Sequence, residues 1–195
     1  MTVKSMTSLP GTTQGSAQGP AREAGSPRMV HADLADAASL RRTFGAFATG
    51  VTVVTVGGRT PHGMTANSFT SVSLQPPLVL VCIDRQAIMH RRICLGFFGI
   101  SVLAAHQEHV ARHFADLQRP LGEAQFDGID CVPGRLTRAP LISGALAHFE
   151  CELWRNCDGG DHTIFVGRLL SLGHVADQDG LLFFRGRFRR LQPDA

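Results

Sequence analysis

A run of small polar residues and a distant Gly-Asp-His triplet are the parts of this chain best suited to bind a polar cofactor. The run, His62–Ser73, is rich in Gly, Thr, Ser and Asn and stands between two apolar segments, Val51–Val56 and Leu78–Ile83. Its backbone N–H groups, together with its amide and hydroxyl side chains, could surround a planar ligand that carries negative charge. The same residue types also form ordinary polar turns, so composition alone leaves both interpretations open.

The triplet Gly160-Asp161-His162 stands just before a β-branched apolar run. An imidazole beside a carboxylate can contact a ligand and can change its charge near neutral pH. A histidine in a surface loop has the same local sequence, and the triplet by itself does not distinguish the two cases.

Two further groups of basic residues are candidate ligand sites. Arg185, Arg187 and Arg189 alternate along the last predicted strand, where they could clamp a dinucleotide phosphate or form a solvated edge. On a helix, His106, His109 and His113 would share one face. These histidines have no obvious carboxylate or cysteine partner, so we expect no metal site.

The elements that must position these residues are mostly strands. Leu40, Phe44 and Phe47 have helical spacing, which predicts a helix that begins near Asp33 or Asp36 and is closed by Gly50. A second helix is predicted from about Ala105 to Leu117. Strands are predicted at Val51–Val56, Met64–Phe69, Leu78–Ile83, Gly99–Leu103, Ala147–Trp154, His162–Leu172 and Leu181–Phe188, the first two forming a hairpin. This pattern indicates a mainly β fold, closed or split into a barrel, with a few peripheral helices.

Composition limits the class of protein further. The chain has 195 residues, 44% of them hydrophobic and 18% charged, which fits one globular domain. A net charge of +3 does not favour a nucleic-acid binder. Residues 1–31 are rich in Gly, Ser, Thr, Pro and Ala and predict a disordered tail, which leaves 32–195 as the domain.

No apolar run approaches the roughly 18 residues that a membrane span needs. Five cysteines, an odd number without a secretion signal, favour reduced thiols and a cytoplasmic location.

Several short motifs in one order resemble the short-chain flavin reductase family, the NAD(P)H-dependent partners of two-component flavin monooxygenases. The similarity covers about Leu40 to Leu191. The motifs that carry it are Phe47-Ala48-Thr49-Gly50-Val51-Thr52-Val53-Val54-Thr55, the His62–Ser73 run, Pro76-Pro77-Leu78-Val79-Leu80-Val81, Gly144-Ala145-Leu146-Ala147, Gly160-Asp161-His162-Thr163-Ile164-Phe165-Val166-Gly167 and Leu181-Leu182-Phe183-Phe184-Arg185-Gly186.

This resemblance implies an FMN-binding split β-barrel, a homodimer with flavin near the subunit interface, and hydride transfer from NADH or NADPH to FMN or FAD. The reduced flavin would then serve a separate flavin-dependent monooxygenase. The resemblance places the Thr-Ala-Asn-Ser loop against the flavin ring, the end of the following strand near the ribityl phosphate, and the Gly-Asp-His loop near NAD(P)H. The residues given these roles are His62, Gly63, Met64, Thr65, Ala66, Asn67, Ser68, Cys82, Asp84, Asp161 and His162.

His162 is also the candidate catalytic residue, through contact with the nicotinamide or its ribose, because hydride transfer depends chiefly on proximity and alignment. We add Arg185 and Arg187 to the cofactor-binding candidates. Asp84 is an acid where a phosphate should be held, so anion binding there must come from backbone N–H groups or from Arg85, Arg91 or Arg92.

Two other functions suit the same barrel. One is a flavin-binding oxidase or electron carrier, and the other is a non-catalytic module that stores or senses flavin. The Gly-Asp-His triplet favours the reductase over both. The sequence does not decide between FMN and FAD, between NADH and NADPH, or between a tightly held flavin and a flavin used as substrate.

Overall fold

The computed structural model describes Met29, His31 and residues 33–191, so most of the predicted 1–31 tail lies outside the described residues. Its helices are α1 (Ala37–Phe44), α2 (Ile88–Ile93), α3 (Glu108–Ala115) and the short 3-10 helix η1 (Gly122–Phe126). Its strands are β1 (Thr49–Gly50), β2 (Thr52–Val56), β3 (His62–Ala66), β4 (Thr70–Leu74), β5 (Pro77–Asp84), β6 (Phe97–Val102), β7 (Cys131–Pro133), β8 (Pro140–Ile142), β9 (Ala147–Gly159), β10 (His162–His174), β11 (Leu182–Phe184) and β12 (Arg187–Arg189).

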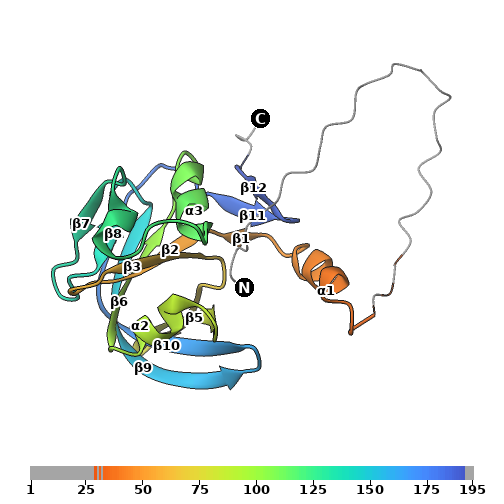
Figure 1. Cartoon of the computed structure of the whole chain (residues 1–195). Helices are drawn as coiled ribbons and strands as arrows, with labels where there is room; N and C mark the ends of the chain where they lie inside the picture. The colour runs from red at the N-terminus through yellow and green to blue at the C-terminus, as the bar shows by residue number, and fades with distance from the viewer. Residues whose placement is uncertain (1–28, 30, 32, 192–195) are drawn as a thin grey trace, which may run out of the picture.

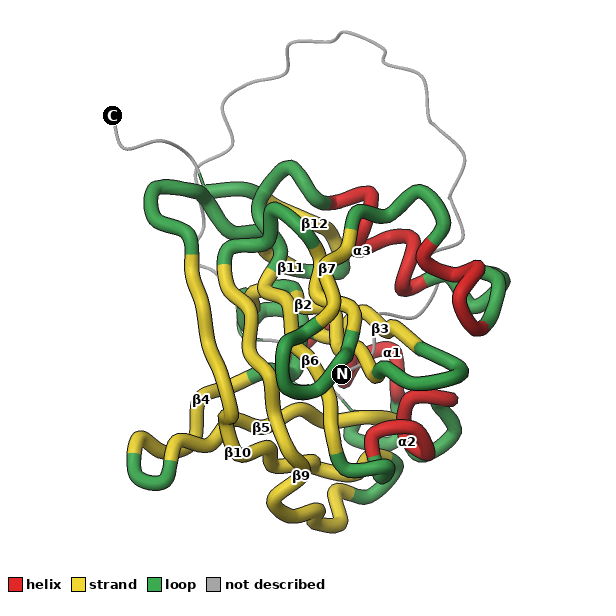
Figure 2. The backbone as a smooth tube through the Cα atoms, turned by 90° about the vertical axis from the view of Figure 1, so that its left-hand side faces the viewer, coloured by secondary structure: helices red, strands yellow, loops and turns green. Residues whose placement is uncertain are grey.

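Seven strands form one antiparallel sheet in the order β3-β2-β6-β9-β10-β5-β4, which confirms the predicted mainly β barrel with few helices. The sheet curls so that strands from both of its ends contribute to one interior cluster (Figures 1 and 2). Val54 and Met64 of β2 and β3 lie in this cluster with Val81 and Ile83 of β5. Phe98 and Phe165 add two buried rings. The barrel is split because β3 and β4, the two end strands, are not hydrogen-bonded to each other.

Strand β2 is buried on both faces because a second core lies on its outer side. Val54 and Val56 face the barrel interior, whereas Val53 packs in a cluster with Val110 and Phe114 of α3. Helix α3 therefore covers the outside of the β2–β3 hairpin. A strand enclosed in this way reads as a continuous apolar run, which is what Val51–Val56 shows.

The end strand β3 is held at its open edge by side chains instead of by another strand. Gln125 of η1 is fully buried and accepts a hydrogen bond from the Gly63 N–H at 2.8 Å. Its amide group donates to the carbonyl oxygens of Pro61 and Gly122. The hydroxyl of Thr65 donates to the Ala111 carbonyl oxygen of α3 at 2.7 Å. The bond to Gln125 satisfies the Gly63 N–H, a backbone group that an edge strand would otherwise leave unpaired.

The two ends of the domain differ from the sequence prediction. The segment 181–188 is not one strand, because Arg185 and Gly186 both have positive φ and turn the chain into the β11–β12 hairpin. Helix α1 is capped by Asp36 as predicted, but it ends at Gly45, not at Gly50. None of its residues is buried, and the side chain of Phe47 beyond it is 77% exposed.

Candidate functional site

Strand β5 brings the two polar segments of the sequence together. On one side of β5, the Ser68 hydroxyl donates to the Cys82 carbonyl oxygen and accepts from the Cys82 N–H, each at 3.0 Å. On the other side, His162 of β10 pairs with Asp84. With neighbouring strands about 4.8 Å apart, the two segments stand about 10 Å apart across the sheet. Residues nearly a hundred positions apart in the chain thus border one area.

The side chains in this area share the outer face of β5 and β10. Burial alternates along both strands, so that Val81, Ile83 and Phe165 are buried in the barrel while their neighbours are half-buried on the outer face. The half-buried residues on this outer face, from register partners on the two strands, are Leu80, Cys82, Asp84, His162, Ile164 and Val166. The apolar members were not predicted as site residues, since an all-apolar run such as Ile164–Val166 does not show which face is inward.

Two polar atoms beside this face are buried and have no hydrogen-bond partner, which is uncommon in a folded protein. They are Asn67 Oδ1 and His162 Nε2, one from each polar segment. A ligand with hydrogen-bonding groups, such as a flavin or a nicotinamide nucleotide, would satisfy them. These two polar atoms and the half-buried apolar residues therefore fit cofactors that carry hydrogen-bonding groups on a planar ring.

The orientation of the His162 ring is fixed by its neighbour. Nδ1 of His162 lies 2.7 Å from Oδ1 of Asp161, and a carboxylate can only accept, so Nδ1 carries the hydrogen. Nε2 therefore presents a lone pair when the ring is neutral and a second N–H when it is protonated.

Five of the residues predicted to contact flavin make contacts with other parts of the protein. The amide of Gly63 donates to Gln125, and a Cβ at Gly63 would lie 2.6 Å from the Phe114 ring. The ring that approaches Gly63 is thus a phenylalanine of α3. Met64 and Ala66 pack in the barrel interior, and Thr65 is bonded to α3. His62, Gly63, Met64, Thr65 and Ala66 therefore also support the position of Asn67, and their contact with flavin stays a prediction.

His62 stands at the opposite end of β3 from Asn67, beneath Arg119. Its side chain is 4% exposed, and Nε2 accepts from Arg119 Nη2 at 3.5 Å, a long contact. The same Nη2 donates to the Gly63 carbonyl oxygen at 2.6 Å. Burial, together with the charges of Arg119 and Arg92, lowers the pKa of His62 to about 4. His62 is therefore neutral at physiological pH.

The predicted arginine clamp is not assembled as expected. Because 181–188 is a hairpin, Arg185 lies in its turn over the Phe184 ring, while Arg187 is exposed on β12. The β11–β12 hairpin belongs to a separate sheet with β1 and stands well apart from the β9–β10 turn (Figure 1). Neither arginine lies with His162 within this subunit.

The three histidines predicted to share one helical face do not all lie on a helix, because His106 precedes α3. His113 Nε2 hydrogen-bonds the Gln125 carbonyl oxygen at 2.6 Å. Among the described residues, no three His, Cys, Asp or Glu side chains gather in a way that could hold a metal ion.

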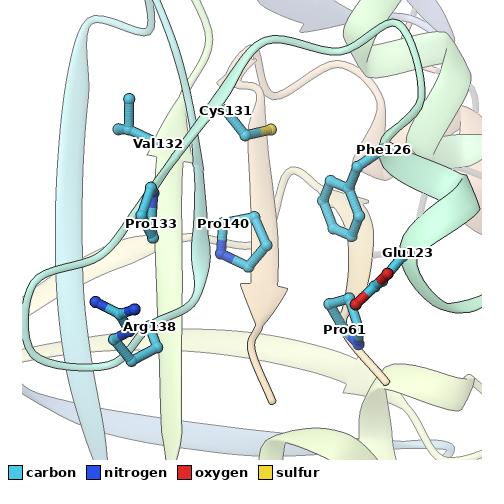
Figure 3. A pocket seen from close by; sticks show the side chains of 8 residues that line it. All are labelled: Pro61, Glu123, Phe126, Cys131, Val132, Pro133, Arg138 and Pro140. Carbon is cyan, nitrogen blue, oxygen red and sulfur yellow. The ribbon is translucent and has the colours of Figure 1, made fainter. Parts of the chain in front are cut away.

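A separate pocket of about 260 Å³ lies between η1 and the β7–β8 hairpin. Phe126 and three prolines form much of its wall, and Arg138 and Glu123 stand on opposite sides of it (Figure 3). No residue predicted to bind cofactor lines this pocket.

Comparison with known proteins decides the family. The model of the flavin reductase like domain matches residues 44–192. The chain belongs to the flavin reductase-like family. A curated relative, an NADH-dependent FAD reductase of Streptomyces globisporus, is 57% identical over 164 residues, which cover 84% of this chain and 90% of the relative. The reductase subunit HsaB of a flavin-dependent monooxygenase from Rhodococcus jostii is 35% identical, with 85% and 83% covered.

Solved structures of the family share this fold. The Streptomyces globisporus NADH:FAD oxidoreductase SgcE6, in complex with NAD and FAD fragments, superposes with a TM-score of 0.81 at 54% identity, covering 86% of this chain and 99% of that one. BorF, the flavin reductase component of a bacterial two-component tryptophan halogenase, gives 0.78 at 56% identity, covering 82% and 100%. The family predicted from the motifs is confirmed.

Proposed function

We propose that this flavin reductase-like chain is an NAD(P)H-dependent flavin reductase that supplies reduced flavin to a separate oxygenase. The observation that carries the proposal is the outer face of β5 and β10, where Asn67 Oδ1 and His162 Nε2 are buried without partners. Each atom belongs to one of the family's two characteristic polar segments. Family membership and the names of the similar reductases support the same activity.

We assign flavin contacts to the Asn67 side and nicotinamide contacts to the His162 side of β5. A bound flavin would supply a hydride acceptor, which no protein side chain provides. Asn67 and the half-buried residues Cys82 and Ile164 would bind and shield the ring, and the backbone near Asp84 would meet the phosphate. The Asp161–His162 pair would orient the nicotinamide, which matters because hydride transfer depends on alignment.

For the cofactors we propose NADH and FAD, with FMN as a second acceptor. The support is that the similar Streptomyces protein is named an NADH-dependent FAD reductase, whereas SmoA of Agrobacterium fabrum, 41% identical, is named an FMN reductase (NADH). The partner is a flavin-dependent monooxygenase, as for HsaB, or a flavin-dependent halogenase, as for BorF.

We further propose a homodimer, supported by apolar groups that the single chain leaves exposed. Strand β4 ends the sheet, carries no charged residue, and exposes Leu74 to 95%. Phe44 and Phe47, at the end of α1 and beyond it, are also exposed. An uncharged edge strand that exposes large apolar side chains such as Leu74 is a surface that proteins normally cover. Sedimentation or light scattering of the wild type and of Leu74→Lys tests this, with a shift toward monomer expected for the variant.

Within the described part of the chain, no helix is long and apolar enough to cross a membrane. We also propose a cytoplasmic location, which the odd number of cysteines in the sequence supports.

Anaerobic mixing of purified protein, flavin and NADH tests the central proposal. We expect rapid bleaching of flavin absorbance with NADH, faster with FAD than with FMN, and unchanged by a chelator. Slow bleaching with every pair of flavin and nicotinamide nucleotide would contradict the assignment as a reductase. The alternatives would then be an oxidase or a module that stores flavin. If the protein quenches flavin fluorescence, and so binds flavin, but NADH does not bleach the flavin, the protein is the flavin-storing module.

A further inference from the structure

The corner between β5 and α2 is joined to the Gly-Asp-His turn by a single arginine. The Arg85 N–H donates to the Asp161 carbonyl oxygen at 3.0 Å, which extends the β5–β10 ladder by one step past the Asp84–His162 pair. Arg85 Nε donates to the Gly160 carbonyl oxygen at 2.9 Å. Its Nη2 forms an ion pair with Asp158 Oδ1, also at 2.9 Å.

The turn that Arg85 contacts consists of two residues, Gly160 and Asp161, between the paired Gly159 and His162. Gly160 has a φ of +78°, and a Cβ at this position would meet nothing within 4 Å. The Asp158 carboxylate accepts from the Gly160 N–H at 2.9 Å, which closes the turn. The Gly160 N–H and the Arg85 side chain together lower the pKa of Asp158. Arg85 thus binds the acid that closes the turn as well as the carbonyl at its apex.

These contacts commit the Arg85 guanidinium to the protein. The sequence left Arg85 open as a phosphate ligand, but its Nε and Nη2 are directed at the turn, and Asp158 balances its charge. Since His162 follows the turn directly, the placement of its unpaired Nε2 depends on the turn.

We infer that Arg85 is a positioning residue, which holds the Gly-Asp-His turn against β5 so that His162 meets the nicotinamide. The assignment of nicotinamide to His162 rests on the proposed function. Asp158 shares this role because it is the acidic partner of Arg85. The side chains of Arg85 and Asp158 are 46% and 79% exposed, so the effect of losing the pair is moderate.

Kinetics of Arg85→Gln, Asp158→Asn and the double variant test the inference. We expect each single change to raise the KM for NADH roughly five-fold, as for the loss of one useful hydrogen bond. The double variant should raise KM by less than the product of the two single effects, because both changes break the Arg85–Asp158 ion pair while each also removes its own bond to Gly160. Flavin affinity, measured by fluorescence quenching without NADH, should stay within two-fold of wild type. Arg59→Gln, the same chemical change at an exposed arginine between β2 and β3, is the matched control and should leave KM unchanged.

A phosphate ligand would behave differently. Arg85→Gln would then weaken flavin binding, while Asp158→Asn would leave it unchanged or strengthen it by removing a nearby negative charge. That pattern overturns the inference. Arg85→Lys keeps the charge but loses the fork of donors, so under the inference it should recover only part of the NADH affinity.

Hydrogen exchange provides a measurement that does not depend on activity. The amides of 159–163 should exchange several-fold faster in Arg85→Gln and Asp158→Asn than in wild type or Arg59→Gln. Unchanged exchange overturns the inference even if wild-type protein reduces flavin. If the amides exchange faster but the KM for NADH is unaltered, Arg85 and Asp158 hold the turn without a role in the reaction. That result also overturns the inference. If wild-type protein fails to oxidise NADH, the proposed function fails. The exchange result still reports whether Arg85 and Asp158 hold the turn.

Discussion

Ser68 occupies both backbone hydrogen-bonding groups of Cys82 with a single hydroxyl. The oxygen donates to the Cys82 carbonyl and accepts from its N–H, so that it replaces the next rung of the β4–β5 ladder. Asn67, the neighbouring residue, keeps a buried Oδ1 without a partner. Ser68 therefore builds the wall of the candidate site, and Asn67 faces the ligand.

Replacing Ser68 with Ala should weaken both the fold and flavin binding. Two backbone groups of Cys82 would lose their partner, at a cost of about 1–3 kcal/mol. For a chain of this length, we expect a melting temperature lower by roughly 2–12 °C. Differential scanning calorimetry and a flavin titration measure the two effects. Ser71→Ala, in exposed β4, should change neither.

Replacing Asn67 with Asp should lower the midpoint potential of the bound flavin. A carboxylate would repel the reduced ring, which carries more negative charge than the oxidised ring. A tenfold preferential loss of reduced flavin corresponds to about 30 mV for a two-electron couple. Spectroelectrochemistry would detect this shift. An unchanged potential and flavin affinity would show that Asn67 does not face the ring. Asn156→Asp, on the exposed part of β9, is the control.

Replacing His162 with Ala should raise the KM for NADH while flavin affinity barely changes. Loss of one hydrogen bond costs about 1 kcal/mol, or several-fold in KM. The structure makes this a demanding test, because His162 pairs with Asp84 on the strand that also carries the flavin contacts. If flavin binding collapses while the KM for NADH holds, the assignments of the two sides of β5 are reversed.

Replacing His62 with Gln should improve stability in acid relative to wild type. The pKa of His62 is lowered from 6.5 to about 4 in the folded protein, so the unfolded chain binds the proton more tightly. This stabilising contribution is complete above pH 6.5 and is lost as pH falls toward 4, a loss of about 3 kcal/mol. Urea unfolding at pH 7, 5.5 and 4.5 should show a flatter pH dependence for the variant. His174→Gln, an exposed site, should follow wild type.

Replacing Glu150 with Gln should destabilise the turn between β7 and β8 at neutral pH. Burial raises the pKa of this carboxyl, but hydrogen bonds from three backbone N–H groups and the Thr137 hydroxyl outweigh burial and lower the pKa below 4.5. The carboxylate therefore stabilises the fold above about pH 4.5, and this contribution disappears as pH falls through the folded-state pKa.

We expect Glu150→Gln to lose about 2 kcal/mol at pH 7 and to approach wild type in acid. Urea unfolding at both pH values measures this. Glu108→Gln makes the same chemical change in an exposed α3 ion pair and should cost under about 0.5 kcal/mol. Equal losses in the two variants would show that the buried carboxylate has no special role.

Much of the fold could be predicted because it depends on local patterns. The apolar runs at Val51–Val56 and Leu78–Ile83 specify strands, and Asp36 specifies a helix start whatever they pack against. Motifs such as Gly160-Asp161-His162 retain their order along the chain, so the family was identified without a structure.

Contacts between distant segments decided what the patterns left open. Gly63 looked suited to a cofactor ring, but the ring against it is Phe114, since α3 folds over β3. The β11–β12 turn at Arg185 separated arginines that a single strand would have aligned. Strand β5 pairs with Ser68 on one side and with His162 on the other. No local sequence pattern predicts which segments a strand pairs with. Residue types therefore determined which groups can bind the cofactors, whereas strand pairing determined which of them meet.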